Sequence, residues 1–148
     1  MNRRRFCVLI PAALASFESI AAGAQPGPVR TFGARLSTVP IDLAMAGTIA
    51  GSGAVTAALK NRTLTVSGTF KGLKSAATIV QLHRSPNRGI RGPAFADLTA
   101  TAAASGEISG SVELTAAQVE DLEKGRLYVQ LHSEKAPDGN LWGWLLAK

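Results

Sequence analysis

The only two histidines of this 148-residue chain end two copies of the same short pattern. A Val-Gln-Leu-His sequence ends at His83 and again at His132, and a loop rich in Pro and Gly follows each copy. Side chains alternate between the two faces of an extended strand, so Gln and His share one face while Val and Leu share the other. If the two strands pair, the histidines lie close together with Gln81 and Gln130 beside them.

Two imidazoles on neighbouring strands suggest a metal site. Imidazole nitrogen is a natural ligand of zinc and copper, but a firm site uses three or four ligands. Glu134 or Asp138, which follow His132, would complete such a set. The alternative is that each histidine ends its strand and bonds to the backbone of the following loop. A third interpretation is a polar contact surface for a partner, and the pattern leaves all three open.

The loops that follow the histidines are the expected place for partner binding. Arg84, Arg88 and Arg91 crowd the first loop, and Glu134 and Asp138 lie in the second. Loops held by a rigid β-scaffold often carry the function of such domains. Basic loop residues are commonly only solvated, but these also fit a weak contact with an anion or an acidic surface. We expect both loops to emerge at the same end of the fold.

A catalytic site is not indicated. A nucleophile needs a base within hydrogen-bond reach and a third group that orients the base. No Gly-x-Ser-x-Gly elbow places a serine between a strand and a helix. We therefore expect a non-catalytic protein without a cofactor, unless copper or zinc occupies the histidine pair.

The first 24 residues have the pattern of an export signal. Arg3, Arg4 and Arg5 precede a mostly apolar run that ends in Ala-Gly-Ala at Ala24, the small residues that a signal peptidase recognises. We expect residues 1–24 to be removed by the general or the twin-arginine route, and a retained apolar anchor is the alternative. Residues 25–30 then form a linker, and residues 31–148 form one exported domain, periplasmic or secreted.

The charge of the exported part is weak. The whole chain has a formal net charge of +6, and without residues 1–24 it keeps 13 Lys and Arg against 9 Asp and Glu, which is +4. Nucleic-acid binding would require clustered basic residues with stacking aromatic residues, so we expect no nucleic-acid partner. Cys7, the only cysteine, falls within the signal, so the domain has no disulfide. It also lacks an apolar run long enough to span a membrane.

Alternation of apolar and polar residues predicts seven or eight short strands. The C-terminal part reads as a hairpin: a strand over 127–132, turn residues over 136–140, and a second strand over 141–146. The preceding strands are expected over 31–39, 47–59, 63–69, 76–83, 95–101 and 106–114. This pattern is typical of an antiparallel β-sandwich.

One helix is expected near residues 115–124. Thr115 and Gln118 form a capping-box pattern, and Gly125 is placed to end the helix. We expect this helix to cover one end or edge of the sheet. Trp142 and Trp144 share one strand face, and we expect them in the core or under the helix, the alternative being an exposed platform for a carbohydrate or a partner.

The order of these motifs resembles the CHRD domain, the repeated module of chordin that also occurs singly in bacterial secreted proteins. The matching segments are Leu64–Ser75, Thr78–Leu98, Leu114–Gln118, Leu127–His132 and Pro137–Gly143. The likeness covers residues 32–146. Family members often have His-Ile-His where this chain has Gln81-Leu82-His83, so the first histidine of that motif is replaced.

The resemblance implies an exported immunoglobulin-like β-sandwich with a poorly defined biochemical role. In chordin the module belongs to a secreted antagonist of bone morphogenetic proteins, a ligand that a bacterial chain does not meet. We therefore expect a binding module with an unknown protein or envelope partner. The alternatives are a periplasmic metal-binding protein that uses His83 and His132, and a structural component of the cell envelope.

Overall fold

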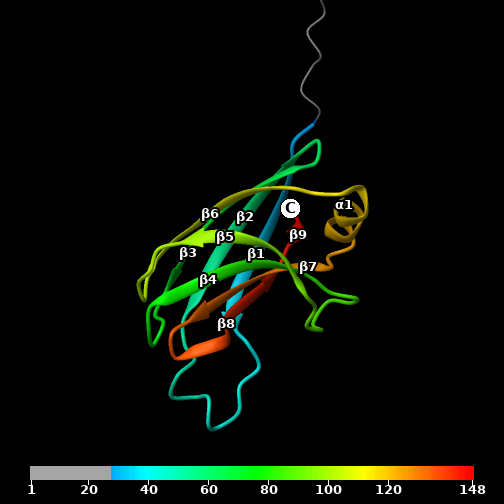
Figure 1. Ribbon diagram of the computed structural model, residues 1–148. Helices are drawn as coiled ribbons and strands as arrows, with labels where there is room; N and C mark the ends of the chain where they lie inside the picture. The colour runs from blue at the N-terminus through cyan, green and yellow to red at the C-terminus, as the bar shows by residue number, and fades with distance from the viewer. Residues whose placement is uncertain (1–27) are drawn as a thin grey trace, which may run out of the picture.

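The computed structural model describes residues 28–148, which form an antiparallel β-sheet and one helix (Figure 1). The predicted signal peptide and most of the predicted linker lie outside the described residues. The elements are β1 (Arg30–Thr38), β2 (Ser52–Lys60), β3 (Thr63–Lys71), β4 (Ala77–Arg84), β5 (Ala94–Ala100), β6 (Gly106–Glu113), α1 (Ala116–Glu123), β7 (Leu127–Ser133), β8 (Ala136–Trp144) and β9 (Leu146–Ala147).

Eight of the strands close into a barrel-like sheet. Their order is β2-β3-β6-β5-β4-β7-β8-β1, and a further pairing of β1 with β2 completes the ring. β1 pairs with β2 along one edge, while Ser37 and Thr38 pair with β8 on the other. At the opposite corner β5 meets β6 only through Thr99 and Ala100. The all-β antiparallel class with one short helix is therefore confirmed, but an immunoglobulin-like sandwich is not, because strands pair across both corners.

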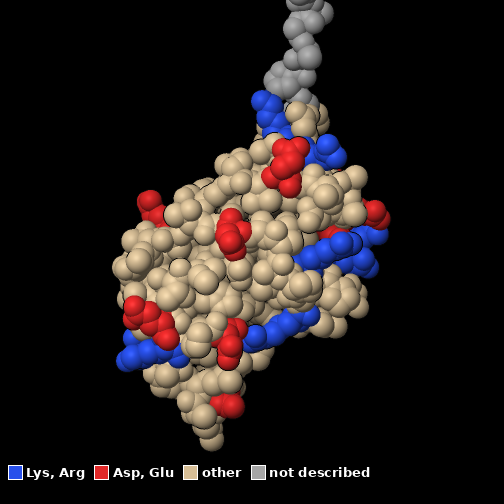
Figure 2. All heavy atoms as spheres, in the orientation of Figure 1, with Lys and Arg blue, Asp and Glu red and all other residues tan. Residues whose placement is uncertain are grey.

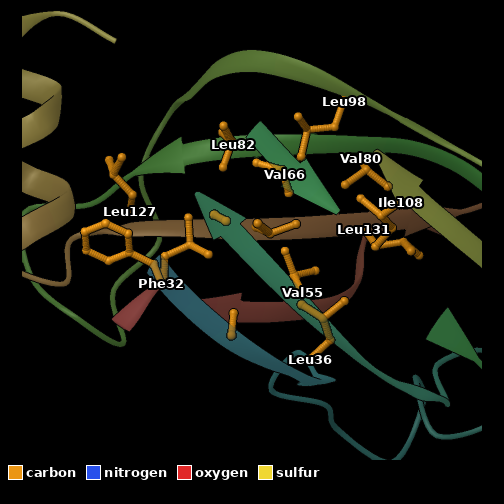
Figure 3. Packing of buried hydrophobic residues seen from close by; sticks show 14 of the residues in the cluster. Phe32, Leu36, Val55, Val66, Val80, Leu82, Leu98, Ile108, Leu127 and Leu131 are labelled. Atoms are coloured by element: carbon orange, nitrogen blue, oxygen red, sulfur yellow. The ribbon is translucent and has the colours of Figure 1, made fainter. Parts of the chain in front are cut away.

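The interior of the barrel is filled by the apolar residues of the alternating strands. Side chains of several strands point toward one another in Figure 3, among them Phe32, Val66, Leu82 and Leu131. Val80, Leu82, Val129 and Leu131 are fully buried, as the repeated pattern requires. Burial of this apolar surface is the main favourable term for folding.

The helix closes one end of the barrel, beside β7 and β9 in Figure 1. Its capping box is present: Gln118 N donates to Thr115 Oγ1 at 3.2 Å, and Thr115 N donates to Gln118 Oε1 at 2.9 Å. Gly125 follows with φ of +71°, the left-handed conformation that ends a helix. Leu122 is buried in the barrel core. The predicted helix and both of its ends are confirmed.

The turn of the last hairpin differs from the predicted one. The structure turns at Glu134 and Lys135, and the segment over 136–140 already belongs to β8. Pro137 fits there because β1 pairs with β8 only from Leu141 onward, so the proline lies on an unpaired edge where no N–H is needed. Gly139 has φ of +133°, so it distorts the strand without ending it.

Charges of both signs are interspersed on the face shown in Figure 2. Among residues 28–148, no helix is long and apolar enough to cross a bilayer.

Replacement of Leu82 by Ala should lower the free energy of unfolding by about 2–5 kcal/mol, because it leaves a cavity between β4 and the opposite wall. Ile79 lies on the same strand, is 50% exposed and serves as the matched control. Ile79→Ala should change stability by no more than about 0.5 kcal/mol. Urea unfolding of both variants measures the difference, and equal losses would contradict the inward and outward assignment of β4.

Candidate functional site

The two Val-Gln-Leu-His copies lie on adjacent strands. β4 and β7 pair antiparallel, with Gln81 directly opposite Gln130 and His83 opposite Tyr128. The apolar residues of both copies enter the core, so their polar residues share the outer face of the barrel. The ring centres of His83 and His132 are 6.4 Å apart.

Each histidine is held by a backbone carbonyl. His83 Nδ1 lies 2.9 Å from Gly92 O, and His132 Nδ1 lies 2.8 Å from Pro137 O. A neutral imidazole can donate only from its protonated nitrogen, so these contacts place the proton on Nδ1 and leave Nε2 with a lone pair. The arrangement matches the expected contacts between strand-end histidines and the loops that follow them.

The loop between β4 and β5 folds back over this outer face. Because β4 and β7 are antiparallel, the loops that follow His83 and His132 begin at opposite ends of the strand pair. The prediction that both loops emerge at the same end of the fold is therefore wrong. Tyr128 brings the first loop back, because its hydroxyl accepts from Gly92 N at 3.0 Å and donates to Gly92 O at 3.2 Å. A Cβ on Gly92 would lie 1.9 Å from Arg84 O, so only glycine fits at this position.

A stack of rings therefore lies under the loop. The His83 ring is 4.8 Å from the Tyr128 ring and nearly parallel to it, and Tyr128 in turn contacts Trp142 and Trp144. Burial lowers the pKa of His83 most; the Gly92 carbonyl opposes this effect, and the nearby His132 and Arg91 add to it. The neutral form of His83 is therefore favoured.

The three arginines of the loop have different surroundings. Arg84 pairs with Asp121 of α1, which is 5% exposed and also lies near Arg126. Arg91 Nη1 donates to Asp138 O at 3.1 Å, and its guanidinium carbon lies 5.9 Å from the centre of the Trp142 ring. Arg91 thus joins the two loops that the sequence singled out, whereas Arg84 is engaged with the helix.

The remaining polar residues do not add an acidic ligand to the histidines. Glu134 and Asp138 are exposed, and no group of three or more His, Cys, Asp or Glu able to hold a metal occurs among residues 28–148. Gln130 is 3% exposed, and its Nε2 donates to Asp138 O at 3.1 Å. The Gln81 side chain is directed toward β5, where its Nε2 donates to Asp97 Oδ1 at 2.8 Å.

The tryptophans lie outside the barrel core, contrary to the prediction. Trp142 and Trp144 are half-buried on the outer face of β8, with ring centres 5.9 Å apart. Together with Arg35 and Arg88 they line a hollow of about 250 Å³. Sequence reasoning missed Arg35 as a site residue. Alternation with buried Ala34 and Leu36 points it outward, but nothing in the sequence places β1 beside β8.

A larger hollow, of about 850 Å³, lies on the outer face of β1, β2 and β3. It shares Arg35 with the hollow at the tryptophans and also includes Lys71 and Lys148. None of the residues that line either hollow is acidic. The two hollows therefore form a surface of basic character beside the paired indoles.

The family model described as CHRD domain matches residues 17–145 of the chain. No curated protein and no solved structure matches it.

The thermal stability of the protein should fall as the pH is lowered from about 7.5 to 5.5. The folded pKa of His83 is lowered, so the unfolded chain takes up its proton first. The stabilisation by neutral His83 is therefore present above the unfolded pKa of about 6.5 and is lost as the pH falls toward the folded value. His83→Asn keeps a donor for Gly92 O but does not titrate, so its melting temperature should depend less on pH. An equally steep decline in this variant would argue against His83 as the source.

Proposed function

Because this chain belongs to the CHRD domain family, we propose that it is an exported, non-catalytic binding domain whose partner carries acidic groups. Export is supported by the basic and apolar pattern of residues 1–24 together with the family assignment. A periplasmic or secreted location follows from this proposal.

The observation that carries the proposal is the pairing of two arginines with two half-buried tryptophans in one hollow. Arg35 and Arg88 are exposed, and their planar guanidinium groups suit bidentate contacts with carboxylates. Trp142 and Trp144 offer rigid apolar surface at a low cost in side-chain entropy. Such a combination of aromatic and arginine residues is enriched in the parts of interfaces that contribute most to affinity.

The adjoining hollow extends the basic surface. Lys71 and Lys148 lie along the same outer face as Arg35, without an acidic residue among the lining side chains. An extended acidic partner could therefore contact the basic residues of both hollows at once. Long-range attraction of this kind accelerates association and weakens with added salt.

A structural envelope component remains the second candidate, supported by the same basic face. It would associate with the envelope through many weak charge contacts, so no single residue of the hollow would control its binding. The metal-binding alternative rests on His83 of β4 and His132 of β7 and is separable by experiment. Of the two arginines, Arg35 is on β1 and Arg88 is in the loop that follows β4.

Arg88→Glu should weaken the binding of the purified chain to an envelope fraction of the cells that export it. We expect roughly a three- to tenfold loss in affinity, because a favourable charge contact is replaced by a repulsive one. Co-sedimentation at increasing salt measures this loss. Lys60→Glu makes the same change of charge at the exposed end of β2, outside both hollows, and should bind like the parent protein.

Three outcomes of this experiment separate the candidates. A loss confined to Arg88→Glu supports the proposed hollow. Equal losses in both variants favour a structural component that responds to total charge. Binding that depends on neither residue nor on salt would contradict an acidic partner.

A further inference from the structure

Three polar atoms on the outer face of β4 and β7 are buried and have no hydrogen-bond partner in the described part of the chain. They are Nε2 of His83, Nε2 of His132 and Oε1 of Gln130. His83 is 8% exposed and Gln130 is 3% exposed, so neither residue is simply solvated. Buried polar atoms usually have a partner, because burial removes an unsatisfied one from water without replacing the lost hydrogen bond.

The three side chains lie close together on the outer face. The His83 ring is 4.8 Å from Tyr128 and 6.4 Å from His132, so it sits between these two residues of β7. Gln130 occupies the position midway between them on the same strand face. Because its Nε2 is engaged by Asp138 O, the amide has a fixed orientation and Oε1 is its free atom.

The backbone contacts prepare both imidazoles as ligands. A metal-binding histidine generally donates its other ring N–H to a carbonyl or carboxylate, which fixes the tautomer and the ring orientation. Gly92 O and Pro137 O make this contact with Nδ1 of His83 and His132, respectively. Two imidazoles that bind one ion at an N–metal distance of about 2 Å have ring centres roughly 4.5 Å apart when they are adjacent and roughly 6.3 Å apart when they lie on opposite sides of the ion. The observed 6.4 Å, between rings inclined by 26°, corresponds to the second arrangement.

We propose that Nε2 of His83, Nε2 of His132 and Oε1 of Gln130 bind one copper ion on the outer face of β4 and β7. Two imidazole nitrogens with one amide oxygen suit the tetragonal N,O coordination of Cu(II), with water as a further ligand. Divalent copper also binds such ligands more tightly than zinc does. Zinc sites generally use three or four protein ligands from His, Cys, Asp and Glu, and this region supplies two.

The charge of Arg91 and the burial of His83 both affect how tightly the site would bind copper. Arg91 is a cation that acts on His83, but its guanidinium is held at Asp138 O and near Trp142. Burial keeps the His83 imidazole neutral and therefore able to bind a metal. Arg91→Gln removes the opposing charge and should tighten copper binding. The proposal does not depend on an acidic partner, and Arg88→Glu should leave copper binding unchanged.

The test is titration of the purified, untagged chain with Cu(II) at neutral pH. We expect one ion per chain, with saturable quenching of the Trp142 and Trp144 fluorescence, since these rings contact the same cluster. The double variant His83→Asn with His132→Asn keeps a donor for each carbonyl but lacks both Nε2 atoms. Loss of a supporting contact alone lowers metal affinity about 10- to 100-fold, so loss of both ligands should lower it at least about 100-fold.

A matched pair of variants examines the third ligand. Gln130→Leu should weaken copper binding, whereas Gln81→Leu, at the cross-strand position that bonds to Asp97, should not. Electron paramagnetic resonance of the parent chain with ¹⁵N-labelled histidine reports the ligands without any substitution. Two imidazole nitrogens in the Cu(II) spectrum are expected.

The proposal is overturned if the folded parent chain shows no saturable copper binding, in which case the free atoms hold water. It is also overturned if the folded double variant binds copper as the parent does, which would place the ion elsewhere. If the double variant fails to fold, the Cu(II) spectrum of the parent chain decides. A spectrum without imidazole nitrogens overturns the proposal, and a spectrum with two imidazole nitrogens supports it. Tighter binding of Zn(II) than of Cu(II) would refute the assignment of the metal.

Discussion

The pairing of β4 with β7 is the constraint on which both the core and the outer-face cluster depend. With Gln81 opposite Gln130, every Val and Leu of the two copies enters the barrel and every Gln and His leaves it. A slip of one residue in either strand would turn its histidine inward and expose its apolar residues. The apolar residues therefore fix the position of the imidazoles, although they lie on the opposite face of the sheet.

The folded-back loop gives this face a second layer. Outward-facing strand residues are usually solvated, but Tyr128 is 1% exposed here because residues 85–93 cover it. The cover is tied down by hydrogen bonds from Tyr128 and Arg91 and by the contact of His83 with Gly92. The environment of the histidines thus depends on a loop that several side chains hold against the outer face.

Local rules predicted local structure well and distant contacts poorly. The capping box at Thr115 and most of the alternating strands follow from nearest neighbours in sequence, so they were identified correctly, although β2 begins at Ser52 and not at residue 47. The turn was misplaced because Pro137 and its neighbours have turn chemistry. They extend β8 because β1 does not pair with them on its side of the strand. The outer position of Trp142, the pairing of Asp121 with Arg84, and the approach of Arg35 to β8 all depend on barrel closure. That closure pairs β1 with β8, whose residues are about a hundred positions apart in the sequence. The alternation of apolar and polar residues does not indicate which distant strands pair.

Barrel closure also restricts how this domain can meet other chains. An open sheet offers a row of unpaired backbone groups to which a foreign strand can add, and the same edge promotes aggregation. Within residues 28–148 the ring leaves only short unpaired stretches, and Pro137 occupies one of them, where it removes a donor from the exposed edge. Strand addition is therefore largely blocked, for a partner and for a second copy alike. Association at the β8 edge must rely on side chains, so its specificity can change by surface substitution without disturbing the hydrogen-bonded framework beneath.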